Sequence, residues 1–380
     1  MPARVANAIP SPIVREHQAY LASLLAEQDF AAAILFDPAN LLAFVGTSHG
    51  PWDRLTCGAI TREGAGVLVC PSFERPTVRG ADAHATIHEC RETEDAFARF
   101  ATALAQAGVR GGRVLLDERM WLTAREALAA ALPHVELQTD PGLLREVRVC
   151  KSAAELNCMD AAQRDGERLY QLLTELVRPG VSELAIYGAA RERMARDGIA
   201  IDPMVQSGPN SAIPHQLTGD RLLQEGDTVV IDSVVNRDGY FNDLTRTFTL
   251  GEIGSRAKRA YQAVRDAQEA AIAAARPGIE CRELDAIARN IITQAGFGEF
   301  FTHRLGHGLG LEIHEPPYLN GANAERLRVG MCMTIEPGVY VPSEFGIRIE
   351  DDIVITENGC RRLGALATDV PPNHLLSRAL

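Results

Sequence analysis

The sequence lacks several features that would point to common classes of protein. No stretch comes near about eighteen consecutive uncharged apolar residues, so nothing predicts a membrane span. Basic residues are outnumbered, and the net charge of -12 argues against a nucleic-acid partner, which would need a basic face. Residues 1–7 contain no apolar secretion core. We therefore expect a cytoplasmic protein with no membrane or nucleic-acid partner.

Paired cysteines are also missing. The eight cysteines are scattered, and no two of them form a C-x-x-C motif. A chain of 380 residues can bury a large core and needs no disulfide staples. We interpret the cysteines as free thiols, mostly buried, of a reducing compartment.

The composition that is present describes a folded, globular chain. Hydrophobic residues make up 46% of it and charged residues 23%. Because 380 residues exceed one ordinary core, the length predicts two domains.

The first part of the chain alternates between helical patterns and short apolar runs. The predicted helices are 11–28, 93–108 and 122–132, and the predicted strands are 31–36, 66–70 and 113–117. This alternation predicts an α/β layer with a largely parallel sheet. The pattern ends near 145–151, so we place an N-terminal α/β domain at residues 1–148.

The second predicted domain, residues 149–380, combines long helices with strand-like segments. A helix from Ser152 to about Val177 begins with a capping-box pattern, because Glu155 lies three residues after Ser152. Helices are also predicted at 183–197, 256–276 and 282–296, and strand-like segments at 226–250, 331–341 and 345–357. Helices around a strongly curved antiparallel sheet would make this domain α+β.

Glycine and histidine are concentrated in the segment 306–315, which reads GHGLGLEIHE. The glycines beside His307 leave room for a close approach to the imidazole and permit unusual backbone dihedrals. We interpret His307 as a metal ligand and His314 as a residue that works beside the metal.

Two pairs of carboxylates could complete a metal site with these histidines. If Arg237-Asp238 is the loop of a hairpin, Asp232 and Asp243 lie opposite each other, about 5 Å apart between Cβ atoms. Opposed like charges destabilise a hairpin unless a cation lies between them. Glu336 and Glu350 are likewise equidistant from a turn around Ser343.

These four carboxylates and one imidazole make a hard, oxygen-rich ligand set. Such a set favours two divalent ions, with Mn²⁺ preferred and Co²⁺ or Zn²⁺ as alternatives. Ions about 3.5–4 Å apart can divide the work of hydrolysis, one generating hydroxide and the other polarising a carbonyl.

With these residues the sequence resembles a known family, the dinuclear M24 or "pita-bread" metallopeptidases. The N-terminal α/β unit and the ending Gly346-Ile-Arg-Ile-Glu-Asp-Asp352 are similar to the prolidase (Xaa-Pro dipeptidase) and aminopeptidase P branch. The resemblance covers about residues 10–370. The residues that carry it are, in chain order, His215, Asp232, Asp243, His307, His314, Glu336 and Glu350.

The resemblance implies a role for each of these residues. The metal ligands would be Asp232, Asp243, His307, Glu336 and Glu350, with Asp243 and Glu350 bridging the two ions. A hydroxide between the metals would attack the carbonyl of a Xaa-Pro bond in a small peptide with proline in the second position, and the family resemblance also implies a homodimer. The catalytic residues would be His215 over the scissile bond, His314 as a donor to the carbonyl and Glu336 as the proton carrier.

Three further residues match family positions around the substrate. His303 precedes His307 by four residues, which would be one helical turn, and would line the site. Arg348 lies two residues before Glu350 and would brace the carboxylates. Tyr340 matches a tyrosine near the active site, although packing alone would also explain it.

The sequence departs from the family pattern at two places. The family usually has Asp-x-Gly at the first aspartate, where this chain has Asp232-Ser-Val, a change that would tighten the pocket or shift the hairpin. Ala322 stands where prolidases often have an arginine for the dipeptide's carboxylate, with Arg326 and Arg328 nearby. Another basic residue would then be needed, and segment 49–54 of a partner subunit is one candidate.

Other functions remain open from the sequence. An aminopeptidase P would act on longer Xaa-Pro peptides, and a metal-dependent amide hydrolase would act on a small solute. A non-catalytic pita-bread module would serve protein interaction. Retention of all five predicted ligands favours an enzyme over the module.

Overall fold

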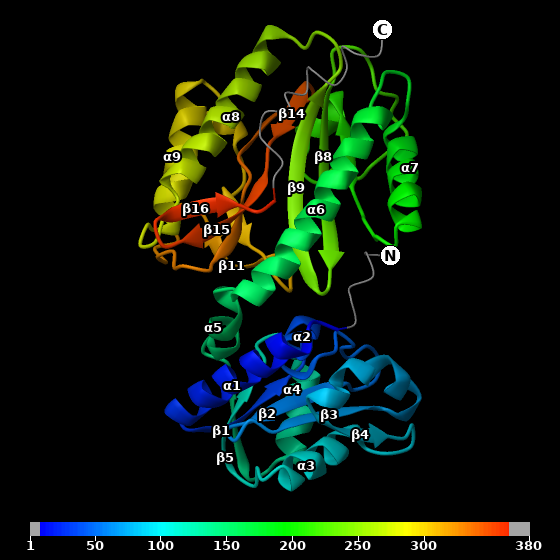
Figure 1. Cartoon of the computed structure of the whole chain (residues 1–380), viewed down its shortest axis with the longest axis vertical. Coiled ribbons are helices and arrows are strands. Elements are labelled where there is room, and N and C mark those ends of the chain that lie inside the picture. The colour runs from blue at the N-terminus through cyan, green and yellow to red at the C-terminus, as the bar shows by residue number, and fades with distance from the viewer. Residues whose placement is uncertain (1–7, 365–380) are drawn as a thin grey trace. The chain divides into compact units, whose positions relative to one another are not determined.

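The computed structural model describes residues 8–364, which divide into two compact units, 8–148 and 149–364 (Figure 1). Residues 1–7, on which the cytoplasmic expectation rests, lie outside the described residues, as do residues 365–380 of the predicted second domain. No helix within 8–364 has the length and apolar character needed to cross a bilayer.

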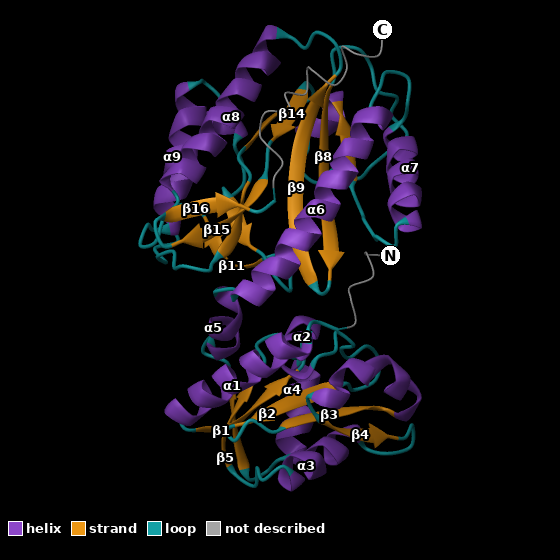
Figure 2. Cartoon of the chain, viewed as in Figure 1, coloured by secondary structure: helices purple, strands orange, loops and turns teal. Residues whose placement is uncertain are grey.

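The first unit is built on one six-stranded sheet with the order β4-β3-β2-β1-β5-β6 (Figure 2). Its strands are β1 (Phe30–Leu35), β2 (Cys57–Thr61), β3 (Gly66–Pro71), β4 (Thr86–Cys90), β5 (Gly112–Leu116) and β6 (Val135–Thr139). Its helices are α1 (Ser11–Glu27), α2 (Pro38–Val45), α3 (Ala96–Gln106), α4 (Leu122–Ala131), α5 (Leu143–Val149) and the 3-10 helix η1 (Ser72–Ala83).

This sheet is mixed, so the prediction of a largely parallel sheet is only partly right. The β1–β5, β5–β6 and β3–β4 pairs are parallel. Strand β2 was not predicted, and it runs antiparallel to both β1 and β3. The link between β2 and β3 consists of residues 62–65 alone, which suits a hairpin, whereas a parallel pair needs a crossover of about a dozen residues or more.

The second unit has three antiparallel sheets with long helices packed on them, which confirms the predicted α+β class. The sheets have the orders β7-β8-β9, β11-β10-β12-β15-β16 and β13-β14. The strands are β7 (Met204–Ser207), β8 (Thr228–Arg237), β9 (Tyr240–Thr249), β10 (Gly306–Gly308), β11 (Glu315–Leu319), β12 (Cys332–Ile335), β13 (Gly338–Val341), β14 (Phe345–Arg348), β15 (Asp351–Thr356) and β16 (Gly359–Arg362). The helices are α6 (Ala153–Leu176), α7 (Glu183–Arg196), α8 (Ser255–Ala274), α9 (Cys281–Gln294) and the 3-10 helices η2 (Gly208–Ala212) and η3 (Gly298–Phe300).

Helix α6 begins as the sequence predicts. The Ser152 hydroxyl accepts from the Glu155 amide, and the Glu155 carboxylate accepts from the Ser152 amide. This capping box satisfies two backbone donors that a helix start leaves open. Along its length the helix lies against the β8–β9 hairpin (Figure 1), where the buried Tyr170 hydroxyl contacts the carbonyl oxygens of Ile231 and Leu244.

The predicted register of the β8–β9 hairpin is wrong by two residues. The turn is Asp238-Gly239, so Asp232 opposes Thr245, and Asp243 opposes Val234. Asp238 and Gly239 both have positive φ, 50° and 86°, as the favoured two-residue hairpin turn requires. An Asp-Gly pair adopts this turn more readily than Arg-Asp, which is why the loop lies one residue later than predicted.

The strand-like segments 331–341 and 345–357 are each divided into two strands. Strand β12 pairs with β15 and β13 with β14, and both ladders are in register about Ser343. Glu336 and Glu350 consequently stand at opposed positions, as predicted, in the gap between the two ladders.

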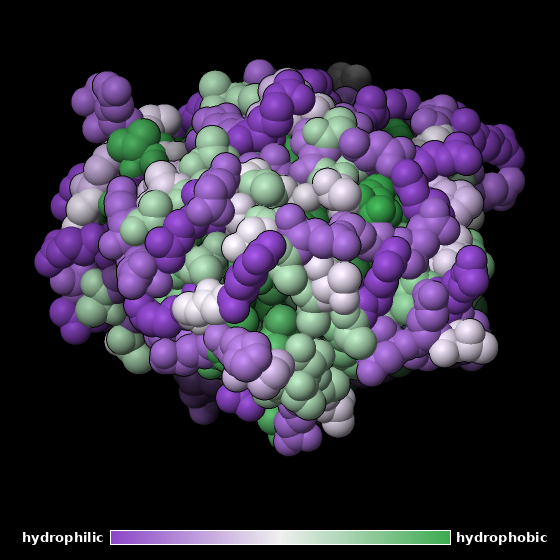
Figure 3. Space-filling view, turned by 90° about the horizontal axis from the view of Figure 1, so that it is seen from below, coloured by the Kyte–Doolittle hydropathy of each residue, from purple (hydrophilic) through white to green (hydrophobic). Residues whose placement is uncertain are grey.

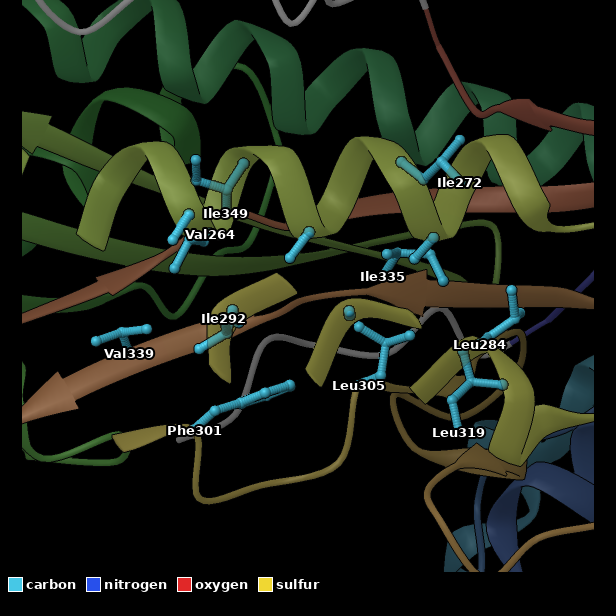
Figure 4. Close-up of a cluster of buried hydrophobic side chains, with 14 of the residues drawn as sticks. Val264, Ile272, Leu284, Ile292, Phe301, Leu305, Leu319, Ile335, Val339 and Ile349 are labelled. Carbon is cyan, nitrogen blue, oxygen red and sulfur yellow. The ribbon is translucent and has the colours of Figure 1, made fainter. Parts of the chain in front are cut away.

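A large apolar core holds the second unit together and joins α8 and α9 to strands β11 to β15 (Figure 4). Val264 and Ile272 of α8 and Ile335 of β12 are among its buried residues. On the surface drawn in Figure 3, hydrophobic side chains occur in small groups among hydrophilic ones. All eight cysteines are free thiols and six are buried, as the sequence analysis predicted.

We predict that Gly239→Ala destabilises the protein by about 1–2 kcal/mol, because an L side chain is disfavoured at positive φ. Urea denaturation would measure the loss. Gly188→Ala in α7 is the matched control, since a Cβ there meets no atom within 4 Å, and it should raise the stability by up to about 1 kcal/mol. Equal effects of the two variants would contradict the turn assignment.

Candidate active site

The two aspartates of the β8–β9 hairpin lie close together although they are not paired. Because strand residues two apart point to the same side, Asp232 and Val234 share a face with Asp243. One carboxylate oxygen of each aspartate lies within 4.8 Å of the other and of a Glu350 oxygen. Val234 is half-buried, and the register has no bulge. The residues after Asp232 thus continue the β8 strand in regular register.

The backbone amides of Glu336 and Glu350 are held by hydrogen bonds to the residue before β10 and to a residue of β9. The Glu336 amide donates to Leu305 O at 2.8 Å, and the Glu350 amide donates to Thr245 O at 3.0 Å. Pro337 follows Glu336 and cannot donate to a ladder. The β12–β13 strand therefore breaks here, and the three sheets meet around the two glutamates.

His307 presents one ring nitrogen to these carboxylates. Its Nδ1 is 3.1 Å from Gly308 O, and its Nε2 lies 3.3 Å from Glu336 Oε1 and 3.8 Å from Asp243 Oδ2. Burial, with the nearby His314, lowers the pKa of His307 to about 3. The imidazole is therefore neutral at physiological pH, which is the form that binds a metal.

The flanking glycines have a different role from the one we predicted. Neither Gly306 nor Gly308 has positive φ. A Cβ on Gly306 would lie 2.0 Å from Thr334 O, and a Cβ on Gly308 would lie 2.5 Å from Pro316 O. The glycines thus let strands β12 and β11 approach the backbone of β10, rather than opening space at the imidazole.

The candidate ligands form three interlocking groups, each with ligand atoms within 4.8 Å of one another. Glu350 is common to two of them, and so are Asp243 and His307. The groups are Asp232, Asp243 and Glu350; His307, Glu336 and Glu350; and Asp243, His307 and His314. Together they contain the five predicted ligands, with His314 in addition.

The donor set fits divalent cations. Burial and the neighbouring carboxylates raise the pKa values of Asp243 and Glu350 well above the usual range. Burial also raises the pKa of Glu336 to about 7, opposed by Arg348. The buried Asp243 Oδ1 has no hydrogen-bond partner. Four carboxylates with one paired guanidinium therefore lack positive charge, which two M²⁺ ions would supply.

That guanidinium belongs to Arg348, which links Asp232 to Tyr340 and Thr245. It donates to Asp232 Oδ2 at 2.6 Å, to Tyr340 Oη at 2.9 Å and to Thr245 Oγ1 at 3.1 Å. Thr245 Oγ1 in turn donates to Glu350 Oε2 at 2.6 Å. Arg348 therefore braces Asp232 directly and Glu350 through a threonine that the sequence analysis missed.

Tyr340 and His303 extend this network. His303 Nε2 lies 2.9 Å from Tyr340 Oη, so the tyrosine contacts both the histidine and Arg348. Burial lowers the pKa of His303 to about 4. The residues between His303 and His307 are not helical, so the prediction that they lie one helical turn apart is wrong. Tyr340 has polar partners at the site and does more than pack.

The two remaining predicted histidines are both exposed, and His314 belongs to one of the ligand groups. The ring of His314 meets that of His307 edge-on at 4.2 Å between centroids. Burial and the charge of Arg304 lower the pKa of His314. His215 is an exposed turn residue after η2, and its charge contributes to lowering the pKa values of both His303 and His314.

A buried carboxylate, Glu183, holds the loop that carries His215. Its Oε1 accepts from the amide and hydroxyl of Ser207, both at 2.7 Å, and its Oε2 accepts from the Gly219 amide at 3.0 Å. Asn210 Nδ2 contacts both oxygens. Glu183 thus fastens the loop at both ends, and its place at the start of an amphipathic helix gave no signal of this role.

Asp352 and Thr334 were also missed. Asp352 Oδ2 accepts from the Asp243 amide at 2.9 Å, and Thr334 Oγ1 lies between the His307 amide and Glu336 Oε1 at 3.1 Å from each. Both residues orient groups of the candidate ligand set. Asp352 stands in the acidic ending that resembles the family, whereas Thr334 has only its position two residues before Glu336 as a signal.

Comparison with known proteins shows the family of the chain. The model of metallopeptidase family M24 matches residues 157–357, and the model of the Creatinase/Prolidase N-terminal domain matches residues 19–150. The chain therefore belongs to metallopeptidase family M24. It is a peptidase with a creatinase-type N-terminal domain and a C-terminal pita-bread domain, as the resemblance implied.

Similar proteins of known sequence or structure are consistent with membership of this family. An uncharacterised peptidase of Staphylococcus saprophyticus is 33% identical over 339 residues, 88% of this chain and 95% of that protein. The structure of a dipeptidase from Pyrococcus horikoshii is similar at 33% identity and a TM-score of 0.82, covering 92% of this chain and 98% of that one. An X-Pro aminopeptidase from Thermotoga maritima has 28% identity and a TM-score of 0.84, with coverage of 92% and 98%.

The buried acids predict how the metal-free protein responds to pH. Above about pH 7.5, one unit beyond the ordinary histidine pKa of 6.5, His303 and His307 are almost fully neutral in both the folded and unfolded states. The acids have folded-state pKa values above their unfolded values. The native state then holds more protons, so its stability falls as pH rises.

We expect the melting temperature in chelator to fall between about pH 7.5 and about pH 8.5, and Mn²⁺ to reduce the fall. Asp243→Asn, which removes one repelling carboxylate, should flatten the profile in chelator. A melting temperature that is constant or rises over this range would contradict the repulsion between the acids.

We predict that Glu183→Gln lowers kcat by about 10-fold, because the loop loses an acceptor and His215 is less well oriented. The same change in a His215→Ala background should cause little further loss, since the residue that Glu183 positions is already gone. Glu192→Gln, on the exposed face of the same helix, is the control. Additive losses would show that Glu183 acts on stability and not through His215.

Proposed function

We propose that this protein hydrolyses the peptide bond before proline in Xaa-Pro dipeptides, using two divalent metal ions. The observation that carries the proposal is the interlocking of the buried groups through Asp243, His307 and Glu350. The similar structures, a dipeptidase and an X-Pro aminopeptidase, support the substrate class. We propose Asp232, Asp243, His307, Glu336 and Glu350 as the metal ligands.

The bound metals would supply a water-derived nucleophile at neutral pH and Lewis-acid polarisation of the carbonyl. Glu336 has a pKa raised to about 7 by burial, so it can hold and release a proton near neutrality. His314, whose pKa burial lowers, is a neutral N–H donor to the oxygen of the scissile carbonyl. His215, in the loop held by Glu183, lies over the scissile bond.

The remaining residues orient these groups. Arg348 holds the Asp232 carboxylate and the Tyr340 hydroxyl, and His303 completes the chain of contacts. Proline in the second position makes the scissile amide tertiary, so it carries no N–H. A site without an acceptor for that proton would accept proline, because no polar group of the site is left unpaired.

The identity of the metal, the cellular compartment and the oligomeric state are proposed on separate grounds. Mn²⁺ is our choice of metal because the ligands are four hard carboxylates and one imidazole. The free thiols fit a reducing compartment, which supports a cytoplasmic protein. The homodimer rests on the family resemblance alone and stays a prediction.

The test is hydrolysis of Ala-Pro and Met-Pro by protein loaded with Mn²⁺. We expect turnover that chelator abolishes, and a Glu350→Ala variant that is folded, metal-poor and inactive. Glu344→Ala, an exposed glutamate in the turn of the same hairpin, is the matched control and should keep both metal and activity. No cleavage of any proline-containing peptide would refute the function, and near-normal turnover of Glu350→Ala would remove that residue from the ligand set.

A further inference from the structure

A buried ion pair is attached to the loop that carries His314. Lys151 Nζ donates to Glu315 Oε1 at 2.6 Å, and the two side chains are only 2% and 6% exposed. Burial opposes the charge of Lys151, but the Glu315 carboxylate and its neighbours outweigh this effect, so the pKa of the ammonium group is raised. Glu315 directly follows His314 and is the first residue of β11. A buried cation therefore contacts the residue next to a proposed catalytic histidine.

The direction of the His314 ring depends on the backbone of this loop. Within residues 8–364 the ring makes no hydrogen bond or ion pair, and it meets the His307 ring edge-on at 4.2 Å between centroids. The His314 side chain is exposed, so packing restrains it little. Residues 309–314, which connect β10 to β11, must therefore hold the ring in the place that the proposed donor needs.

Gly310 is where the loop contacts both the ion pair and a neighbouring strand. A Cβ on Gly310 would lie 2.8 Å from Lys151 Cε and 2.9 Å from Glu315 Oε1, so the pair packs against the α-carbon of the glycine. The Gly310 carbonyl accepts a hydrogen bond from the Phe241 amide of β9 at 2.8 Å. The middle of the loop is thus held by β9 and by the ion pair.

The start of β11 has few backbone donors of its own. Pro316 and Pro317 follow Glu315, and neither has an N–H to donate to a ladder. The pairing of β11 with β10 is also irregular, between His307 and Gly308. The side chain of Glu315 supplies a connection that the main chain lacks at this point.

Lys151 is itself fixed by its surroundings. Its amide donates to Gly330 O at 2.8 Å, and the next residue, Ser152, begins the capping box of α6. Glu155 of the same box accepts from the hydroxyl of Tyr240, the first residue of β9, at 2.9 Å. The ammonium group is therefore presented from the ordered start of a long helix.

A buried ion pair contributes little net stability compared with an apolar pair of the same volume, but its charged hydrogen bond fixes the groups that it joins. We propose that Lys151 is a positioning residue, which holds the loop 309–314 through Glu315 and so keeps His314 directed at the scissile carbonyl. The inference rests on the proposed function, which gives His314 that role.

The experiment replaces the pair by Lys151→Met with Glu315→Leu, which removes both charges and keeps most of the volume. With Ala-Pro and Mn²⁺-loaded protein, kcat should fall on the order of 10- to 100-fold, because the donor is displaced. KM and the bound Mn²⁺ should change by less than about twofold. In a His314→Ala background the same pair of changes should cause little further loss, since the positioned ring is already gone.

Hydrogen exchange of the Mn²⁺-loaded protein gives a second readout, which needs no substrate. The amides of residues 309–315 should exchange about 10-fold faster in the pair variant, with the rest of the second unit unchanged. Lys258→Met with Glu252→Leu is the matched control, because it removes an exposed ion pair of the same composition near the start of α8. This control should alter neither kcat nor the exchange of the loop.

Unchanged kcat or unchanged exchange in the pair variant would overturn the positioning role. So would an undiminished loss of kcat in the His314→Ala background, or faster exchange throughout the second unit. Lys151→Gln with Glu315→Gln, which keeps a hydrogen bond without charge, is a second pair variant and should lose less kcat. If neither pair variant folds, the ion pair serves the fold and the inference is wrong. A wild type that cleaves no proline-containing peptide would overturn the proposed function, while the exchange result would still decide whether the pair holds the loop.

Discussion

The repulsion between four clustered carboxylates is the constraint on which the rest of the site depends. Asp232, Asp243, Glu336 and Glu350 are held by a scaffold that places their ligand atoms within a few ångströms. Burial removes the water that would screen their charges, and Arg348 is paired with only one of them. Such a cluster is stable when it is protonated or when it binds cations. The affinity of the protein for divalent metal and its response to pH are thus two expressions of one interaction.

The backbone overcomes this repulsion by dividing the acids among separate sheets. Asp232 and Asp243 belong to a hairpin that is packed on a long helix, and Glu336 and Glu350 stand where another pair of ladders is interrupted. The Glu336 amide bonds to Leu305 beside β10 of the same sheet, and the Glu350 amide bonds to Thr245 of β9. Each acid is therefore held by main-chain hydrogen bonds that do not depend on its charge. His307 enters the ligand groups from β10, and His314 enters them from the loop that follows it.

The grouping of the five candidate ligands could be predicted from the sequence, because four carboxylates and a histidine in strand-like segments are recognisable as a set although each one alone is a weak signal. The geometry was harder to predict. The hairpin register followed Asp238-Gly239, since positive φ at both turn positions outweighed simple symmetry. The spacing of His303 and His307 suggests one helical turn, although the segment between them is not helical. Glu183 and Thr245 gave no signal, because their roles arise from contacts between residues distant in sequence, and no periodicity within one segment encodes such contacts.

Main-chain hydrogen bonds and apolar packing hold the candidate metal-binding positions. Mutations can therefore remove catalysis without removing the fold. Replacing one clustered acid by a neutral residue removes repulsion and leaves the hairpins intact, so drift away from catalysis meets little resistance from stability. Selection for activity must hold the acids in place continuously. Descendants that lose that selection should keep this architecture long after they have lost the metals, and would be available for other roles.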